Sequence, residues 1–382
     1  MPIQKMNQKR FCRWLQQLTS LPAASGREDR VAAWVERWVD ARPDLKLRRD
    51  GTGNLLLTRK NTSRRAARSR RLWFTAHMDH PAFVVRTRLD DTHFELEFRG
   101  FILKAYLEGA LIELLDVKGR AHPARIVQLE TGASPFPRMV ARGADPDARI
   151  QAGDIGRWRF PGRSVPGIRK GQLHAPACDD LAALTAALAV LDWARKKTAL
   201  AHVGVLLTRA EEVGFLGAIA ACRNRSISKA DRLLCLEATR SYPDAPLGGG
   251  PILRVGDQIG IFDSHLTHRI GCLLHRHQKT FPGFRWQRKL MSGGACEASA
   301  FGAYGYTAAC ACLPLGNYHN MRDPDTKLLR ARAVPERIDL GDFYGLIELL
   351  SVVAMGLDDP EIPSLKEVLG KRFEERKSVL YP

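Results

Sequence analysis

The sequence predicts an α/β fold, with a mostly parallel, mixed sheet that carries helices on both faces and a small inserted all-β domain. Three observations support this prediction. Short apolar runs alternate with segments of helical spacing on both sides of a central stretch that has only short alternating runs. The length of 382 residues allows two domains. The 45% share of hydrophobic residues, with 26% charged, excludes disorder of the whole chain.

The N-terminal elements are predicted from spacing and turn signals. Residues 5–19 have helical spacing that places apolar side chains on one face. A second helix is expected to run to Val39 from a cap at Ser25, because Glu28 stands three residues after Ser25 and completes a capping box. Two strands are expected next, at 55–57 after the DGTGN turn and at 72–76.

The central stretch, from about 87 to 167, has short alternating runs separated by Gly, Pro and Asp, and no long helical pattern. The chain beyond it alternates between strands and helices. The strands are expected at 203–208, 233–236 and 307–313, and the helices at 180–195 and 214–222. We therefore expect a discontinuous domain of residues 1–86 and 168–382, interrupted by a β-barrel-like domain at 87–167.

Histidine and acidic side chains follow the predicted strands where each strand ends, and in one case open a helix. They are His77, Asp79, Asp179, Asp180, Glu211, Glu212, Glu237 and His319. The carboxyl ends of strands in open α/β sheets line the ligand crevice. Imidazoles and carboxylates suit two divalent metals there, since crowded carboxylates without cations would repel one another. Each motif alone would be a strand end, a solvated pair or a helix cap, and only the joint arrangement favours a metal site.

Six motifs occur in the order found in dinuclear zinc exopeptidases. They are AHMD at 76–79, CDD at 178–180, AEEVGFLGA at 210–218, LEAT at 236–239, GGACEA at 293–298 and NYHN at 317–320. Over nearly its whole length the chain resembles metallopeptidase family forty-two, the tetrahedral and glutamyl aminopeptidases. The resemblance implies a cytoplasmic metal-dependent aminopeptidase, acting on peptides as a homo-oligomer. It also implies two divalent ions per chain, zinc first, with cobalt or manganese as alternatives.

The same resemblance implies a set of metal ligands. His77 and Glu237 would bind one ion, Glu212 and His319 would bind the second, and Asp179 would bridge the two. It implies no particular substrate-binding residue.

Two matched residues would have other roles. Asp79 would fix the tautomer of the His77 imidazole. Glu211 would act as the general base, taking a proton from the attacking water and passing it to the departing amine.

Three positions depart from the family pattern. Glu237 and Glu297 stand where the family has Asp, and His80 follows HMD where the family commonly has Glu. We expect Glu237 still to bind metal, because related exopeptidases use Glu there. Glu297 is expected to affect specificity more than metal binding, and His80 is expected to be a loop residue or a polar contact in the pocket.

Charge is the unusual feature, with a formal net charge of +18. The stretch Arg59–Arg71 is the most basic, and we expect it to be a solvated loop between two strands. A basic binding protein that contacts nucleic acid or anionic partners through this stretch is the alternative of another class. The alternative within hydrolases is cleavage of another amide, such as an acyl-amino acid or a carboxy-terminal residue.

No apolar run approaches the roughly 20 residues that span a bilayer, and no secretory signal is recognised, so no membrane partner is expected. The eight cysteines form no CxxC pair, and we expect buried thiols of a reducing compartment. A histidine cluster is expected to lie on the surface without binding metal. Its members are His265, His268, His275 and His277.

Overall fold

The sheet at the centre of the larger lobe has eight strands in the order β1-β2-β12-β3-β13-β16-β14-β15. The computed structural model describes residues 4–60, 70–130, 134–162, 165–325 and 331–381. The strands are β1 (Leu45–Arg49), β2 (Leu55–Arg59), β3 (Leu72–His77), β12 (Val203–Thr208), β13 (Arg232–Arg240), β14 (Ile252–Gly256), β15 (Gln287–Leu290) and β16 (Thr307–Leu315). The four central strands are mutually parallel, whereas β2 and β14 pair antiparallel with them. The predicted mostly parallel, mixed sheet is confirmed.

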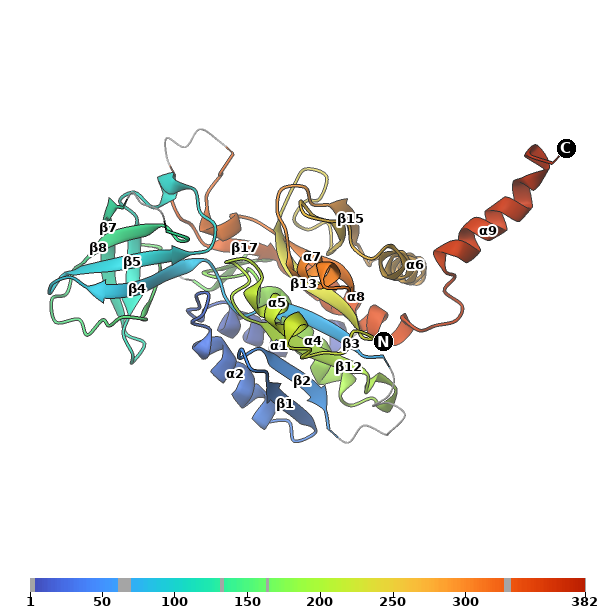
Figure 1. Cartoon of the computed structure of the whole chain (residues 1–382), viewed down its shortest axis with the longest axis horizontal. Helices are drawn as coiled ribbons and strands as arrows, with labels where there is room; N and C mark the ends of the chain where they lie inside the picture. Colours follow the sequence, from blue (N-terminus) through green and yellow to red (C-terminus); the bar gives the residue numbers. More distant parts are fainter. Residues whose placement is uncertain (1–3, 61–69, 131–133, 163–164, 326–330, 382) are drawn as a thin grey trace.

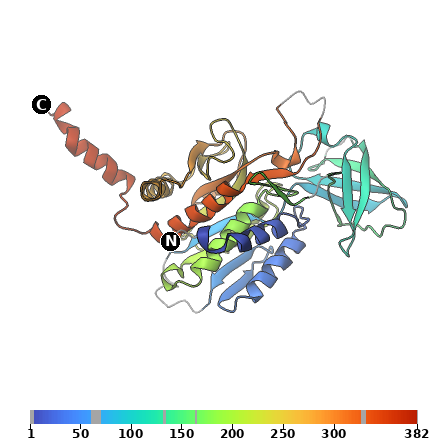
Figure 2. The same cartoon turned by 180° about the vertical axis from the view of Figure 1, so that it is seen from behind.

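Helices cover both faces of this sheet because successive strand residues point to opposite sides. On β3, Phe74 packs with the helices of one face, and Trp73 packs with those of the other. Figure 2 shows α1 (Gln4–Leu18), α2 (Asp29–Asp40), α4 (Leu181–Ala194) and α8 (Leu340–Gly356) on the first face. Helix α6 (Ser264–Thr280) packs into the same core, while α5 (Leu216–Arg223) and α7 (Glu297–Ala303) cover the second face.

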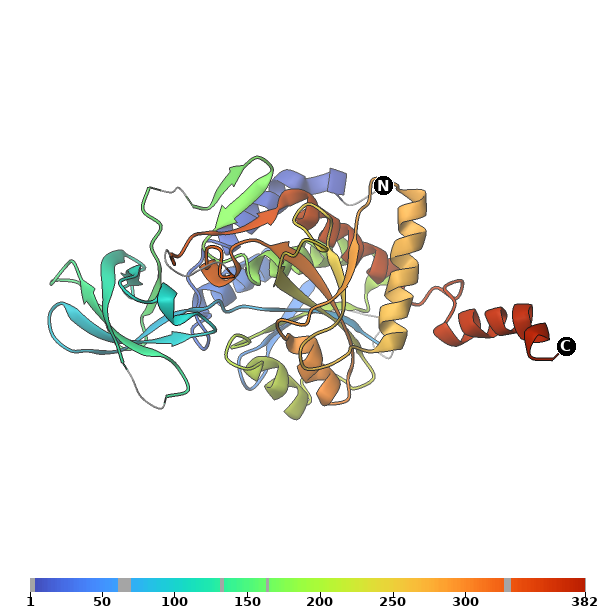
Figure 3. The same cartoon turned by 90° about the horizontal axis from the view of Figure 1, so that it is seen from above.

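A closed barrel forms the second lobe, at one end of the molecule (Figure 3). Its strands are β4 (Ala82–Arg88), β5 (His93–Arg99), β6 (Leu111–Leu115), β7 (Ala121–Leu129), β8 (Arg138–Gly143) and β9 (Ile155–Trp158). Phe83, Phe98 and Trp158 pack edge-on or tilted in its core. The predicted small all-β module is therefore present, while the exact domain division at 87 and 167 stays a prediction.

The remaining elements join these two lobes or extend from them. A small sheet contains β10 (Gly167–Arg169), β11 (Gln172–Ala175) and β17 (Glu336–Asp339). Single 3-10 turns are η1 (Lys104–Tyr106), η2 (Thr198–Leu200), η3 (Tyr318–Asn320) and η5 (Lys377–Val379). Helix α9 (Leu365–Arg376) projects from the end of the molecule opposite the barrel (Figure 1).

The predicted capping box of the second helix is wrong. Helix α2 begins at Asp29, and its N-cap residue, Glu28, makes no side-chain cap. The Ser25 hydroxyl instead donates to Asp79, and the Glu28 carboxylate accepts from the backbone of Gly26 and Ala210. Partners from distant segments have replaced the local bonds that the sequence pattern suggests.

The other sequence features lie as follows. The four histidines of the predicted surface cluster lie on α6, and no candidate metal group among the described residues includes them. All eight cysteines are free thiols, six of them buried. Of the basic stretch, residues 61–69 lie outside the described residues. No helix in the described part of the chain is long and apolar enough to cross a membrane.

Candidate metal centre

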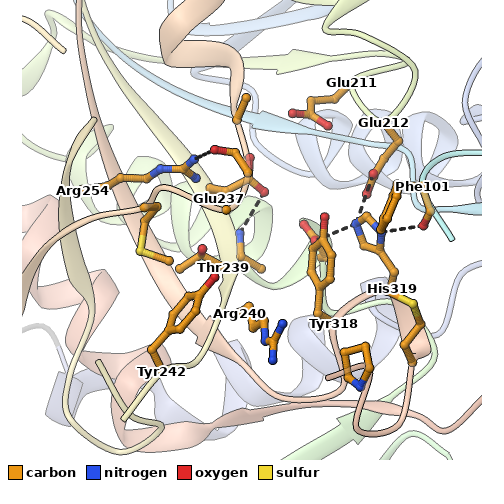
Figure 4. A pocket seen from close by; sticks show the side chains of 18 of the residues that line it. Phe101, Glu211, Glu212, Glu237, Thr239, Arg240, Tyr242, Arg254, Tyr318 and His319 are labelled. Atoms are coloured by element: carbon orange, nitrogen blue, oxygen red, sulfur yellow. Dashed lines mark hydrogen bonds and ion pairs between the residues drawn. The ribbon is translucent and has the colours of Figure 1, made fainter. Parts of the chain in front are cut away.

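The predicted site residues meet at one edge of the large sheet, where the parallel strands end. His77 is the last residue of β3, and Glu237 lies within β13. Glu211 and Glu212 follow β12, Asp179 precedes α4, and His319 lies in η3 after β16. Figure 4 shows the side chains of Glu211, Glu212, Glu237 and His319 converging on one pocket. Parallel strands bring their carboxyl ends together, which explains how residues so distant in sequence meet.

Two groups of potential ligands share one carboxylate, that of Asp179. In the first group, His77 Nε2 lies 3.4 Å from Asp179 Oδ1 and 3.6 Å from Glu237 Oε1. In the second, His319 Nε2 lies 3.3 Å from Glu212 Oε2 and 3.8 Å from Asp179 Oδ2. A third group combines His77 with Glu212 and Glu211. Such an arrangement can hold two cations with Asp179 between them.

The donor atoms of this site fit a divalent cation. Among the described residues, His77 Nε2, Asp179 Oδ1 and Glu212 Oε1 are buried and make no hydrogen bond. Buried polar atoms in proteins nearly always have a partner, so three orphaned atoms at one point need a common one. Imidazole nitrogen with carboxylate oxygen is a ligand set that suits zinc, cobalt or manganese.

The pKa values of the buried carboxyl groups support the same interpretation. Burial raises the pKa of Glu211 and Glu212 well above the usual value. Burial, with the nearby charge of Glu237, raises the pKa of Asp179 to about 8. Burial alone would lower the pKa of His77, but the charge of Glu211 and the other carboxylates raises it well above its usual value. The cluster thus ionises fully at neutral pH only if cations offset its negative charge.

The His319 imidazole is oriented to present a lone pair to the site. His319 Nδ1 lies 2.8 Å from the carbonyl oxygen of Phe101 and donates to it, which leaves Nε2 unprotonated toward Glu212. Burial, with the nearby His80, lowers the pKa of His319 to about 3, so the ring is neutral. A neutral nitrogen facing a carboxylate oxygen is unfavourable unless a cation lies between them.

Asp79 lies behind His77 and does not line the pocket. Its carboxylate accepts from the Ser25 hydroxyl at 2.6 Å and from the backbone N–H groups of Glu211 at 3.0 Å and Glu212 at 3.2 Å. Burial opposes its ionisation, but the neighbouring His77 and these hydrogen bonds lower the pKa of Asp79. One ionised, buried carboxylate therefore positions both the His77 ring, 3.4 Å away, and the segment that carries the two glutamates.

Two further positioning residues were not predicted from the sequence. Glu336 on β17 is fully buried, and its Oε2 accepts from the backbone of Cys178 at 2.7 Å and Asp179 at 3.0 Å. Glu28 accepts from the backbone of Ala210 at 3.0 Å, next to the glutamate pair. Neither belongs to a motif with chemical meaning, because each acts on backbone that only the folded chain brings near.

Of the three departures from the family pattern, Glu237 lines the pocket, whereas His80 and Glu297 do not. His80 is buried and bridges the carbonyl oxygen of Asp179, at 2.7 Å, and the side chain of Asn320, at 3.0 Å. His80 lies in the loop between β3 and β4, as one of the two alternatives predicted, and it does not line the pocket. Glu297 opens α7, and burial raises its pKa to about 7. The neighbouring Gly293 and Gly294 line the pocket, whereas Glu297 does not.

The pocket has a volume of about 390 Å³ and is lined by both acidic and basic side chains. Thr239, Arg240, Tyr242 and Arg254 line the part of the pocket away from Glu212 and His319, and Glu237 lies beside them (Figure 4). Arg254 is only 2% exposed, and its Nη2 donates to the carbonyl oxygen of Gly294 at 3.0 Å and lies 3.8 Å from Asp257 Oδ2. Arg240 forms an ion pair with Asp325. The cavity therefore presents a buried guanidinium close to the metal-ligand carboxylates.

Comparison with known proteins concerns the family resemblance and the fold. The M42 glutamyl aminopeptidase family model matches residues 142–323, a range that contains every predicted metal ligand except His77. This match confirms the resemblance that the sequence motifs indicate, and it supports the predicted enzyme class, a metallo-aminopeptidase. No curated protein sequence matches the chain.

Solved structures share the fold at low sequence identity. An aminopeptidase from the archaeon Desulfurococcus kamchatkensis is 21% identical, with a TM-score of 0.71, covering 91% of this chain and 95% of that one. A TET aminopeptidase from a marine sediment Thaumarchaeota archaeon is 19% identical, with a TM-score of 0.71 and coverage of 94% and 99%. The Pyrococcus horikoshii TET1 peptidase, described as assembling into a tetrahedron or a large octahedral shell, is 18% identical, with a TM-score of 0.68 and coverage of 91% and 99%. The predicted zinc-exopeptidase-like fold is confirmed.

Proposed function

We propose that this chain is a metal-dependent exopeptidase that removes N-terminal residues from peptides. The observation that carries the proposal is the pair of ligand groups that share Asp179 on one side of a 390 Å³ pocket. His77, Asp179 and Glu237 would hold one divalent ion, and Asp179, Glu212 and His319 the other. When bound, two such ions polarise a scissile carbonyl and lower the pKa of water that attacks it. Zinc is the proposed metal, because nitrogen and oxygen donors of this kind suit it.

Glu211 is the proposed general base. It lines the pocket, and its Oε2 lies 4.0 Å from His77 Nε2. The carboxylates of Asp179 and Glu237 lie closer to that nitrogen. The Glu211 backbone is held by Asp79, so the carboxylate is pre-positioned before substrate arrives. Burial raises the pKa of Glu211, which makes the group able to accept a proton from water and return it to the leaving amine.

The charges of the pocket favour a free amino terminus as the substrate end. An α-ammonium group is a cation that can pair with the carboxylates, whereas a substrate carboxylate next to Glu211, Glu212 and Glu237 would be repelled. The buried guanidinium of Arg254 in the same pocket favours an acidic first side chain. The match to the glutamyl aminopeptidase family model supports this preference.

Assembly and location are proposed from the relatives and the cysteines. Two of the matching structures are described as a dodecamer and as a tetrahedron or octahedral shell, so we infer a homo-oligomer for this chain. The eight free thiols are consistent with a reducing, cytoplasmic compartment. The barrel, inserted after His77, contributes to assembly or to limiting access to the pocket.

Hydrolysis of matched peptides tests the proposed function. The purified chain, loaded with zinc or with cobalt, would be given peptides that begin with Glu, Asp, Leu or Lys, each with a free and with an acetylated N-terminus. We expect release of the first residue from free peptides only, with Glu and Asp fastest. Cleavage of acetylated peptides, or release of residues from the carboxyl end, would indicate a hydrolase of another amide instead of an aminopeptidase. No cleavage of any peptide would contradict the proposal.

A further inference from the structure

A second cavity, of about 410 Å³, opens at the edge of the large sheet opposite the metal centre. Its walls come from β1, from the segment that leads into β3, and from the loop at 226–231. It lies near the start of β3, whereas His77 ends that strand, so the length of the sheet separates the two sites. We call it the amino-edge pocket, lined by Lys46, Arg48, Leu56, Thr58, Arg70, Arg71, Trp73, Ser226, Ile227, Ser228, Ala230 and Asp231.

Four cations line the amino-edge pocket, and none of them forms an ion pair with a described residue. Lys46 and Arg48 project to the same side of β1 because they are two residues apart on a strand. Within the described residues, the Arg48 guanidinium donates only to the backbone oxygen of Ser226, at 2.6 Å, and the Arg71 guanidinium only to that of Ala201, at 3.5 Å. Arg70 makes no hydrogen bond within the described chain, so the cationic charge of the pocket is not neutralised.

Basic residues near the pocket, but outside it, do form ion pairs. Arg49, next to Arg48 on β1, pairs with Glu36, and Arg195 pairs with Asp44 and Asp192. Acidic partners are thus supplied on the other face of the same strand pair but not inside the pocket. Like charges gathered without partners favour an anionic ligand.

The single acid of the pocket does not offset these cations. Asp231 uses one oxygen to accept from the backbone N–H of Arg71, at 3.0 Å. The other oxygen accepts from the indole of Trp73, at 2.9 Å, and from the backbone of Ser228, at 3.3 Å. The carboxylate is therefore buried among neutral donors and shapes the floor of the pocket.

The rest of the lining adds an apolar floor and hydroxyl groups. Leu56, Trp73 and Ile227 are buried side chains that line the cavity, and Thr58 and Ser228 contribute hydroxyls. A volume of about 410 Å³ falls within the range of small-molecule sites, roughly 300–1,000 Å³. Cations beside an apolar floor suit a ligand that combines a phosphate with a flat organic group.

We propose that the amino-edge pocket binds a phosphate monoester of nucleotide size, with its phosphate held by Lys46, Arg48 and Arg70. The organic part of the ligand lies against the floor formed by Leu56, Trp73 and Ile227. The site is independent of the proposed peptidase activity, since no residue of one pocket lines the other.

Calorimetric titration of the whole chain tests the site, with inorganic phosphate, adenosine monophosphate and a single-stranded DNA decanucleotide as probes. The variant is Lys46→Gln with Arg70→Gln, two exposed side chains that make no hydrogen bond within the described residues. The matched control is Lys9→Gln with Arg13→Gln, which removes the same charge from the exposed part of α1. Circular dichroism and peptide hydrolysis verify that both variants remain folded.

We expect one molecule of adenosine monophosphate per chain, bound at least tenfold more tightly than inorganic phosphate. The pocket variant should weaken this binding at least tenfold, as loss of charged hydrogen bonds implies, and the control should leave it unchanged. Equal affinities for adenosine monophosphate and inorganic phosphate would contradict a ligand of nucleotide size. Binding of the oligonucleotide alone, or equal weakening by both variants, would overturn the pocket and indicate an extended basic surface. Absence of any binding would also overturn the proposal.

Discussion

Opposite charges occupy the two edges of one sheet. At the carboxyl edge, the carboxylates near His77 are almost entirely buried. They belong to Asp179, Glu211, Glu212 and Glu237. At the amino edge, the cations of the second pocket are half-buried or exposed. A buried charge must be neutralised within the protein, whereas an exposed one is solvated by water.

This difference separates two kinds of site. The acidic edge is tied to the free energy of unfolding, because its carboxylates resist ionisation until cations enter. Substitution of the cations at the basic edge should change the free energy of unfolding little, since these cations interact mainly with water. Experiments at the first edge should therefore change stability, metal content and catalysis, and those at the second should change binding alone.

The largest expected effect is on catalysis, from Glu211→Gln at the acidic edge. The variant keeps the shape of the side chain but removes the proton acceptor, so kcat should fall by about 10²–10⁴-fold. Metal content, measured by inductively coupled plasma mass spectrometry, should be unchanged. Glu212→Gln is the matched control, expected to lose bound metal. If Glu211→Gln lost the metal instead, Glu211 would be a ligand and the roles of the pair would be reversed.

Metal removal should destabilise the chain, and more so at higher pH. Burial raises the folded-state pKa of Asp179 to about 8, above its unfolded value of about 4. The folded, metal-free chain thus holds more protons than the unfolded one in this window, and its free energy of unfolding falls as pH rises. Metal at a hundredfold excess over Kd should restore about 3 kcal/mol.

Thermal unfolding with and without chelator, at pH 5.5 and pH 8, measures this dependence. The gap between the two Tm values should widen at pH 8. A gap of the same size at both pH values would mean that the carboxylates are not the groups that the cations stabilise.

A smaller effect is expected on specificity from Arg254→Met. Loss of the buried guanidinium should lower kcat/KM for peptides that begin with Glu by about 10–100-fold, and leave peptides that begin with Leu nearly unchanged. Arg240→Met, which removes a more exposed guanidinium of the same pocket, is the matched control and should change the ratio less. An equal loss on both peptides would give Arg254 a structural role only.

The smallest expected effect concerns Ser25, the hydroxyl donor to Asp79. Ser25→Ala should lower the free energy of unfolding by about 1 kcal/mol, the usual cost of one hydrogen bond. Urea titration of the metal-free chain measures it. Ser20→Ala removes a partly exposed hydroxyl that bonds only to its own helix, and it should cost less. Equal losses of stability in the two variants would contradict the positioning role of Asp79 and its partners.

The sequence predicted the central strands well, for a physical reason. The strand expected at 203–208 matches β12, and the strand expected at 72–76 differs from β3 by one residue. Both are buried on each face and are therefore continuous apolar runs with sharp ends. The sequence did not reveal α8 or the edge strand β15. Helix α8 is apolar nearly all round and has no amphipathic period, and β15 (QRKL) is polar and exposed.

Most metal-ligand candidates were predictable because they end or follow a strand or precede a helix, and strand ends can be inferred from the sequence. Glu237 was expected to follow a strand at 233–236 but lies within β13, which continues to Arg240. The residues that hold the metal-ligand candidates were not predictable. Glu336 reaches the backbone of Asp179 from 157 positions away, and Glu28 reaches Ala210 from 182 positions away. Arg254 lies on the short strand β14 and lines the pocket, and no sequence motif singled it out. Contacts between distant segments depend on packing, which a local pattern does not encode.

The most direct test of the central claim is a zinc titration of the metal-stripped chain, with bound metal and hydrolysis of a Glu-initiated peptide measured in the same samples. The account predicts no hydrolysis in the stripped chain, and activity that rises with occupancy until two ions are bound per chain. His319→Ala should then saturate with fewer ions and remain inactive. Full activity in the stripped chain, or two bound ions without hydrolysis of any free-amine peptide, would contradict the claim.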